Sequence, residues 1–342
     1  MLALDANGVE VKTHVFVSDG FTAEGGVILA NAKIDGQLDC SGGRFIGNNK
    51  ALALDAKGVE VKTQVFVSDG FTAVGDVSFS TSRIDGNFQL EGGHFSSALD
   101  LRRAKIDTLI NSESGSMDGW PAKGSLGIDG LLYEHIADFS SPNSTFQLGW
   151  IDRGQHNRFR PQPFEQLADV FRKMGLEEDA RKVMIEKNKE HANYVRGKPE
   201  WLWYGLFGKL IGYGYLPWRA FFISLGVVGV GWLIFLVGYC TRLITPTSDD
   251  AYGTVRHSTH QLLESYPKFN SFIYSLETFV PLVKLGIGDH WMPNANRGWR
   301  LGVGPVGFTT GGLLRIYYWF HITAGWVLSA LWVGALTGLV KT

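Results

Sequence analysis

Cysteine and charge are both scarce in this chain of 342 residues. Its two cysteines, Cys40 and Cys240, are too few for a disulfide framework or a four-cysteine zinc site. Charged residues make up 19%, against about 25% in an average soluble protein. The formal net charge is −1, so the chain lacks both the basic excess of a nucleic-acid-binding protein and the acidic excess of a disordered tail. We therefore expect no nucleic acid among its partners.

A repeat with a period of 50 residues fills the first hundred positions. The segment LALDANGVEVKTHVFVSDGFTA at 2–23 returns as LALDAKGVEVKTQVFVSDGFTA at 52–73. The two copies differ at only two positions, Asn7/Lys57 and His14/Gln64. In the diverged second halves, most identities fall on glycine or apolar residues, which is typical of positions held by a core or a turn.

Inside each repeat the apolar residues come in alternating pairs, which predicts short strands whose successive side chains point to opposite faces. The pairs in the first repeat are Val9/Val11, Val15/Val17, Phe21/Ala23, Val27/Leu29 and Leu38/Cys40. Polar and glycine corners separate them too closely for ordinary hairpin strands. The pattern predicts a mainly β fold, a right-handed β-solenoid (β-helix) whose coils pair and bury an inward ladder. Cys40 aligns with Leu90, so we expect it to point inward.

We expect the solenoid domain to span 1–150, with repeats at 1–50 and 51–100 and a degenerate cap at 101–150. The amino end has no cap, because Met1-Leu2 stands where Ala51-Leu52 stands in the second copy. An open coil edge invites pairing with another chain. Two explanations are open, a partner stacked on this end or a shortened form of a longer solenoid, and we favour the second.

A helical period replaces the alternation after Pro161 and Pro163. Apolar residues at i, i+3, i+4 and i+7 predict one amphipathic helix that ends at Gly175, and a second that runs towards Val195. The apolar positions are Phe164, Leu167, Ala168, Phe171 and Met174 in the first helix and Leu176, Ala180, Val183 and Met184 in the second. We expect a helical hairpin over 151–200 that covers the last coil.

Two long apolar segments predict a two-span α-helical membrane domain over 201–342, with the lipid bilayer as a partner. The spans lie near 220–240 and 316–340, and each is long enough to cross a hydrocarbon core of about 30 Å. The charges flanking the first span are nearly balanced. Because we find neither a secretory signal nor paired cysteines, we expect the solenoid in the cytoplasm and the 242–315 loop outside.

The loop between the spans contains two motifs of weak specificity. His257, His260 and Glu264 would share a face and offer three metal ligands if 256–266 is helical, but an ordinary solvated loop is the reading we favour. GVGPVG at 302–307 matches the GxGxxG pattern, yet no strand precedes it, so we interpret it as a flexible loop. We assign no catalytic residue, cofactor or metal.

The second span contains an ionisable residue and a line of small ones. His321 either faces a partner or cavity, or is a hydrogen-bonded histidine near the interface, and we favour the latter. Ala330, Gly334 and Gly338 form a small-xxx-small stripe that supports close helix packing. That stripe serves either the first span or a homo-oligomer.

The segment 269–291 between the spans is apolar but too short to cross a bilayer, which predicts a re-entrant or surface-lying helix. The order of span, short helix, GIGD and span resembles that of two-span cation channels, whose filters expose backbone carbonyls. The residues that would line such a pore are Glu277, Gly286, Gly288 and Asp289. Lys284 in the same segment would oppose cation passage.

Several motifs, taken in order, resemble a family of bacterial β-helix or pentapeptide-like repeat membrane proteins commonly labelled membrane-associated oxidoreductase. They include ALALDAKGVEVK, PQPFEQLADVFRKMGLEEDARKVMIEK, IGYGYLPWRA and WFHITAGWVLSALWVGALTGLV. The resemblance covers essentially the whole chain and implies a solenoid followed by two spans in the bacterial inner membrane. The family name implies redox activity, with no cofactor motif to carry over.

From these patterns we expect a non-enzymatic role, in which a membrane-bound solenoid acts as a binding or assembly scaffold for a protein partner on its face. Two alternatives are an oligomeric channel or transport component that uses the 269–291 segment, and a membrane-associated oxidoreductase as the family label implies.

Overall fold

The computed structural model describes residues 2–47, 52–111, 118–137, 144–154, 158–248, 251, 265–301 and 308–337. The chain forms two compact units, Met1–Trp201 and Leu202–Thr342. The solenoid and the helical hairpin both lie within the first unit.

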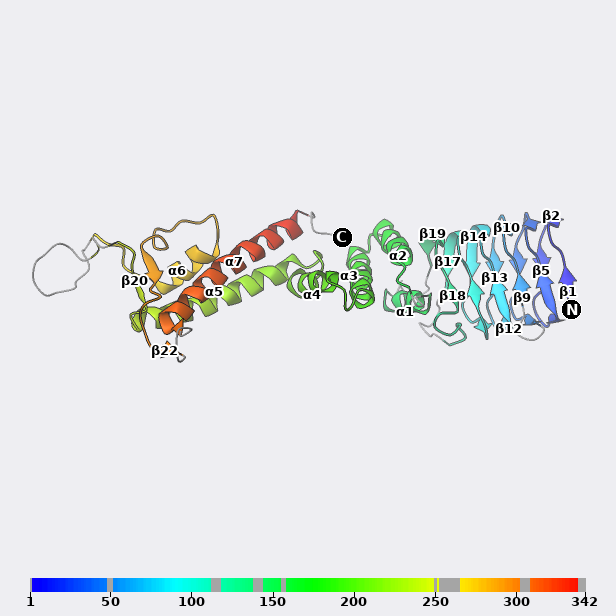
Figure 1. The fold of residues 1–342 in the computed structure, drawn as a ribbon. Helices are drawn as coiled ribbons and strands as arrows, with labels where there is room; N and C mark the ends of the chain where they lie inside the picture. Colours follow the sequence, from blue (N-terminus) through cyan, green and yellow to red (C-terminus); the bar gives the residue numbers. More distant parts are fainter. Residues whose placement is uncertain are drawn as a thin grey trace, which may run out of the picture. The chain divides into compact units, whose positions relative to one another are not determined.

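Short strands stacked in parallel form the expected solenoid in the first unit, with about five turns in the part described (Figure 1). One sheet contains β1 (Leu2–Asp5), β5 (Gly26–Ile28), β9 (Leu52–Asp55), β13 (Asp76–Ser78), β16 (Leu99–Asp100) and β18 (Leu126–Gly127). A second contains β2 (Glu10–Val11), β3 (Val15–Phe16), β6 (Lys33–Ile34), β7 (Leu38–Asp39), β10 (Glu60–Val61), β11 (Val65–Phe66), β14 (Arg83–Gln89), β17 (Lys105–Ile110) and β19 (Leu132–Ile136). A third contains β4 (Thr22–Glu24), β8 (Arg44–Ile46), β12 (Thr72–Val74) and β15 (His94–Phe95).

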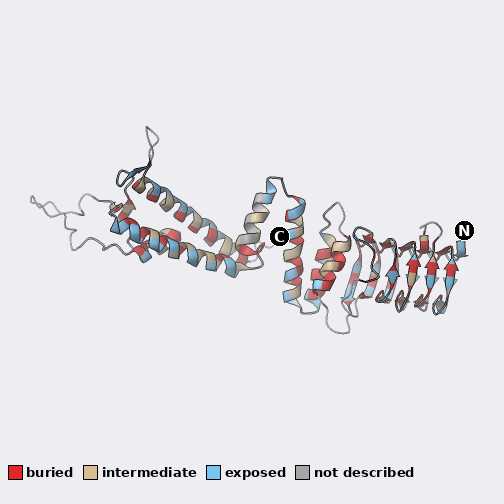
Figure 2. Ribbon diagram, turned by 90° about the horizontal axis from the view of Figure 1, so that it is seen from below, coloured by how far each residue is buried: buried red, intermediate tan, exposed pale blue. Residues whose placement is uncertain are grey.

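Coils of two lengths alternate along the solenoid. Leu4 pairs with Val27, Val27 with Leu54, and Leu54 with Val77, which are steps of 23, 27 and 23 residues. Each 50-residue repeat therefore forms two coils. The alternation of buried and exposed residues along the strands is visible in Figure 2, and the inward Cys40 is fully buried, as expected.

A column of aromatic rings runs through the interior, with one ring in each coil. The ring centroids of Phe21, Phe45, Phe71 and Phe95 follow one another at 5.4, 5.2 and 5.6 Å. Trp120 continues the column 6.0 Å from Phe95. Burial of one such ring contributes about 1.5–3 kcal/mol, and each tilted ring pair adds about 0.5–1.5 kcal/mol.

The rings fit because each large residue lies opposite a small one in the next coil. Phe45 pairs with Ala23 on one side and with Ala73 on the other. Where the odd coils carry Phe-x-Ala, the even coils carry Gly-x-Phe, and a Cβ on Gly43 would lie 2.6 Å from the carbonyl oxygen of Val17 in the preceding coil. A coil is therefore complementary to its neighbours and not to itself, which explains why the sequence repeats over two coils.

Helix α1 (Ser144–Gly154) closes the carboxyl end of the solenoid (Figure 1). Trp150 stacks edge-on against Trp120 at 5.7 Å and is almost fully buried. The buried amides of Asn111 and Gln147 exchange hydrogen bonds of 3.0 and 2.7 Å. The degenerate coils expected over 101–150 are present in β17, β18 and β19 up to Ile136, and α1 follows them from Ser144. The helix covers the last coil without leaving a further sheet edge.

The expected hairpin follows as α2 (Gln162–Lys173) and α3 (Glu177–Tyr194). Its predicted apolar faces are buried, except that Met174 is exposed and Leu176 is half-buried. Strand β19 lies against α2. The side-chain amide of Gln162 donates through Nε2 to the carbonyl of Leu131 at 3.0 Å, and the side-chain amide of Gln166 donates to the carbonyl of Tyr133 at 2.7 Å. These side chains satisfy the outer edge of the last strand, which would otherwise be open.

The second unit is built on two long helices. Its elements are α4 (Glu200–Ile211), α5 (Pro217–Cys240), α6 (Ser271–Phe279) and α7 (Thr310–Leu336), with the antiparallel pairs β20 (Ile244–Pro246) and β21 (Trp291–Pro293), and β22 (Arg300–Leu301) and β23 (Phe308–Thr309). Helices α5 and α7, of 24 and 27 residues, are long and apolar enough to span a membrane, as expected.

We expect Phe71→Ala to lower the free energy of unfolding by about 3–5 kcal/mol, because it removes a fully buried ring that stacks on both sides. Val74→Ala, three residues away and 38% exposed, is the control and should change it by less than about 0.5 kcal/mol. Chemical unfolding of the intact chain in detergent, followed by circular dichroism, measures both. Equal small effects would contradict the ring column as the main source of solenoid stability.

Candidate functional site

Residues 252–264, with the metal candidates His257, His260 and Glu264, lie outside the described part of the chain, as does GVGPVG at 302–307. Among the residues that the structure describes, no three or more His, Cys, Asp or Glu side chains are placed to hold a metal ion. Burial raises the pKa of the Cys40 thiol and keeps the thiol protonated. Cys40 is therefore an unreactive residue of the core.

Glu277, on α6, is committed to a turn of its own unit. Its carboxylate accepts the backbone N–H groups of Gly286, Ile287 and Gly288 at 3.1, 2.9 and 2.9 Å. Burial alone would raise the pKa of this carboxyl, but the backbone donors outweigh burial and hold the pKa below its usual value. The side chain thus replaces the backbone acceptors that this tight turn lacks.

The remaining pore candidates belong to the same turn. Gly286 has φ +83°, which favours glycine, and Gly288 packs against the Glu277 side chain. Asp289 is largely exposed and lies 4.0 Å from the Lys284 ammonium group. Helix α6 has 9 residues and spans only about 14 Å, so it does not cross a bilayer by itself. The structure brings Glu277, Gly286 and Gly288 together as a structural turn.

His321 lies at the point where three helices meet and is fully buried. Its Nε2 lies 3.0 Å from the carbonyl oxygen of Ser275, so this nitrogen carries the proton. Gly231 of α5 makes the crossing possible, because a Cβ there would lie 2.5 Å from both the imidazole and the Ser275 hydroxyl. His321 is thus hydrogen-bonded, and its position near the membrane interface stays a prediction. The sequence does not reveal the roles of Gly231 and Ser275. These two residues and His321 are separated from one another by 44 to 90 positions along the chain, so no local pattern connects them.

The small-residue stripe of α7 does not mark the described helix crossing. Ala330 is exposed and Gly334 is half-buried, while Gly338 lies outside the described residues. The buried face instead carries His321, Gly325 and Leu328. Packing of Ala330 and Gly334 against a second copy stays a prediction.

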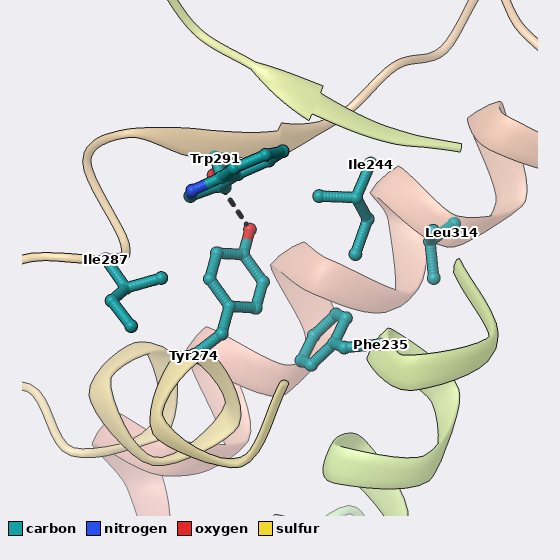
Figure 3. Close-up of a cluster of buried hydrophobic side chains, with 6 residues drawn as sticks. All are labelled: Phe235, Ile244, Tyr274, Ile287, Trp291 and Leu314. Carbon is teal, nitrogen blue, oxygen red and sulfur yellow. Dashed lines mark hydrogen bonds between the residues drawn. The ribbon is translucent and has the colours of Figure 1, made fainter. Parts of the chain in front are cut away.

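A buried cluster adjoins His321, whose ring lies 5.4 Å from that of Phe235. Phe235 of α5, Tyr274 of α6 and Leu314 of α7 meet Trp291, and the Tyr274 hydroxyl donates to the carbonyl of Trp291 at 3.1 Å (Figure 3). Phe235 and Tyr274 stack edge-on at 4.9 Å. The cluster and the His321 contacts together hold α6 between the two long helices.

The solenoid carries a polar hollow, here called the basic groove, of about 310 Å³. Its charged side chains are Lys57, Arg102, Arg103, Arg160, Asp100 and Asp129. Arg102 holds Asp100 through bonds of 2.8 and 2.6 Å, and Arg160 approaches Asp129 at 3.8 Å. Burial acts to raise the pKa of the Asp100 carboxyl, but hydrogen bonds from Arg102 lower it below its usual value. Basic side chains therefore outnumber acidic ones in this groove.

Comparison with known proteins gave no match to a protein-family model, a curated protein or a solved structure.

We expect Glu277→Gln to destabilise the second unit by about 1.5–3 kcal/mol, the usual contribution of hydrogen bonds to a charged group. Because the folded-state pKa of Glu277 is lowered, its stabilisation is present above the unfolded pKa of about 4.3 and is lost as the pH falls through the folded value. The unfolding temperature in detergent, measured as the pH is lowered through this acid range, should fall more steeply for the unaltered chain than for Glu277→Gln.

Asp289→Asn is the matched control in the same turn, because this carboxylate is 79% exposed. It should change the unfolding temperature little at any pH, since exposed ion pairs contribute about 0–1 kcal/mol. A Glu277→Gln variant that behaves like Asp289→Asn would refute the structural role of the carboxylate.

Proposed function

We propose that the chain is an integral protein of the bacterial inner membrane whose solenoid acts as a binding or assembly scaffold in the cytoplasm. The observation that carries this proposal is the outer surface of α5 and α7. Large apolar side chains are 56% to 66% exposed there, namely Trp218, Phe222 and Val237 on α5 and Trp319, Phe320 and Trp326 on α7. Surfaces of this kind are covered by lipid or by another protein.

The low burial of these helices separates them from the core helices of soluble proteins. Only 22% of the most apolar stretch of each helix is buried, whereas an apolar helix in a soluble core is buried on all sides. The polar contacts within the pair, at His321 and Ser275, face inward. This inside-polar, outside-apolar arrangement is the one that a bilayer favours.

The solenoid has the opposite surface. Over the first four coils its outward columns alternate in charge, with Glu10, Lys33, Glu60 and Arg83 beside Lys12, Asp35, Lys62 and Asp85. Ion pairs form within this face, at 3.4 Å between Lys12 and Asp35 and at 2.8 Å between Arg83 and Asp85. A regular face of this kind suits water and polar partners, which supports a scaffold held beside the membrane.

The resemblance to bacterial repeat proteins with two spans belongs to the same proposal. A pore around 269–291 is the less supported alternative, because the carboxylate of Glu277 is occupied by the amides of its own turn.

We expect the chain to stay in the membrane pellet after an alkaline carbonate wash. Val230→Arg, at an exposed position midway along α5, should release or destabilise it, because an arginine at the bilayer centre costs about 2.5–3.5 kcal/mol. Phe16→Arg, at a solenoid position that is 62% exposed, should leave the partition unchanged. Release of the unaltered, folded chain into the wash would disprove membrane integration.

The two native thiols report the orientation. Cys240, at the carboxyl end of α5, is exposed, whereas Cys40 is buried in the solenoid. With the solenoid in the cytoplasm, a membrane-impermeant maleimide added to spheroplasts should label Cys240, and Cys240→Ser should abolish the labelling. Labelling that requires permeabilised membranes would reverse the proposed orientation.

A further inference from the structure

One corner of the solenoid turns through a residue with positive φ in every coil described. From β1 onward these residues are Gly8 (+67°), Asn31 (+54°), Gly58 (+66°), Thr81 (+57°), Arg103 (+59°) and Gly130 (+76°). Glycine and asparagine adopt this conformation readily, whereas a β-branched threonine and an arginine do so at a cost. The strained pair, Thr81 and Arg103, both line the basic groove.

Strain of this kind persists where the side chain has a task that glycine would not perform. The turn itself does not require Arg103, because its N–H donates to the carbonyl of Asp129 through the backbone alone, at 3.1 Å. Gly8 and Gly58 make the equivalent backbone bonds, each at 2.8 Å. What Arg103 adds to the corner is a guanidinium group.

The internal repeat supplies a second, independent observation. One of the two differences between the near-identical segments 2–23 and 52–73 places Lys57 in the groove, where the first copy has Asn7. At Asn7 the corner has an amide in place of the lysine, and the Nδ2 of Asn31 donates to the side-chain oxygen of Asn7 at 3.4 Å. Two corners with the same backbone therefore differ by one positive charge, and the corner that carries this charge lines the groove.

The cations of the groove are not all neutralised by their neighbours. Arg102 is held by Asp100, and Arg160 lies within reach of Asp129. Among the described residues, Lys57 and Arg103 form no ion pair. Two positive groups therefore face the same hollow without a salt bridge of their own, although the charge of Lys57 also helps to lower the pKa of the Asp100 carboxyl.

We propose that the basic groove binds a phosphate group, with Lys57 and Arg103 as its contacts. Guanidinium forks match the oxygens of phosphate, and a lysine ammonium adds a compact charge. The phosphate belongs either to a small soluble ester or to a lipid headgroup. This inference names the ligand chemistry of the solenoid surface and rests on the proposed scaffold function.

The test titrates inorganic pyrophosphate into the intact chain in detergent by calorimetry at about 0.01 M salt, where screening is weak. We expect saturable binding that weakens as salt is raised. Lys57→Asn, which restores the residue of the first copy, and Arg103→Gly, which restores the usual residue of the corner, should each raise the dissociation constant at least about fivefold.

Lys62→Asn is the control, because it removes one positive charge from the same coil on a face outside the groove. It should leave binding unchanged. Arg103→Gly should keep or raise the unfolding temperature, since glycine relieves the strained φ, so lost binding cannot be ascribed to unfolding. Absence of saturable binding, or equal binding by Lys57→Asn, Arg103→Gly and Lys62→Asn, would overturn the proposal and would leave resistance to carbonate extraction unaffected.

Nanodiscs separate the two sources of phosphate. If the ligand is a lipid headgroup, pyrophosphate should bind more weakly in discs that contain phosphatidic acid than in discs of phosphatidylcholine, and Lys57→Asn should remove that difference. If the ligand is a soluble ester, pyrophosphate should bind equally in both.

Discussion

The fit of each aromatic ring over a small residue of the next coil is the constraint on which the first unit depends. Phe45 lies between Ala23 and Ala73, and the same relation repeats along the column. This fit determines which coils can be neighbours, and it explains why one 50-residue repeat contains two coils. It also explains the end of the solenoid, where Trp120 presents a ring that only another large apolar group covers well, and Trp150 of α1 provides it.

Elsewhere, side chains form hydrogen bonds with backbone groups that have no backbone partner. Gln162 and Gln166 accompany the outer edge of β19, Glu277 accepts three amides from a turn, and His321 donates to the carbonyl of Ser275. Each replaces a strand or helix partner that the local geometry does not offer. In the two units, polar side chains thus do structural work at positions that resemble functional sites when only their residue types are considered.

The sequence predicts the solenoid and the two long helices because both leave a local periodic trace. Alternation of Val9 and Val11 reveals a strand, and uncharged runs of more than 20 residues reveal spans. Cys40 is placed inward by its alignment with Leu90. The sequence does not reveal that each repeat forms two coils. The near-identity of whole segments 50 residues apart hides the weaker similarity between coils 23 residues apart.

Contacts between segments that are distant along the chain are not predictable from the sequence for a different reason. Ser275 and His321, or Asn111 and Gln147, meet only after helices have packed, and no spacing rule connects them. Helix α1 has too few apolar positions to reveal its face in isolation. The basic groove is invisible for the same reason, since Lys57, Arg103 and Arg160 come from three separate stretches of chain.

The complementarity of neighbouring coils limits how this architecture changes length. Insertion or loss of a single coil would place phenylalanine opposite phenylalanine in the strand register, and alanine opposite alanine or glycine opposite glycine beside it, whereas a pair of coils preserves every contact. With strands about 4.8 Å apart, such a rod grows or shrinks in increments of about 10 Å. The spacing between any two features on its surface is therefore adjustable in evolution only in coarse steps.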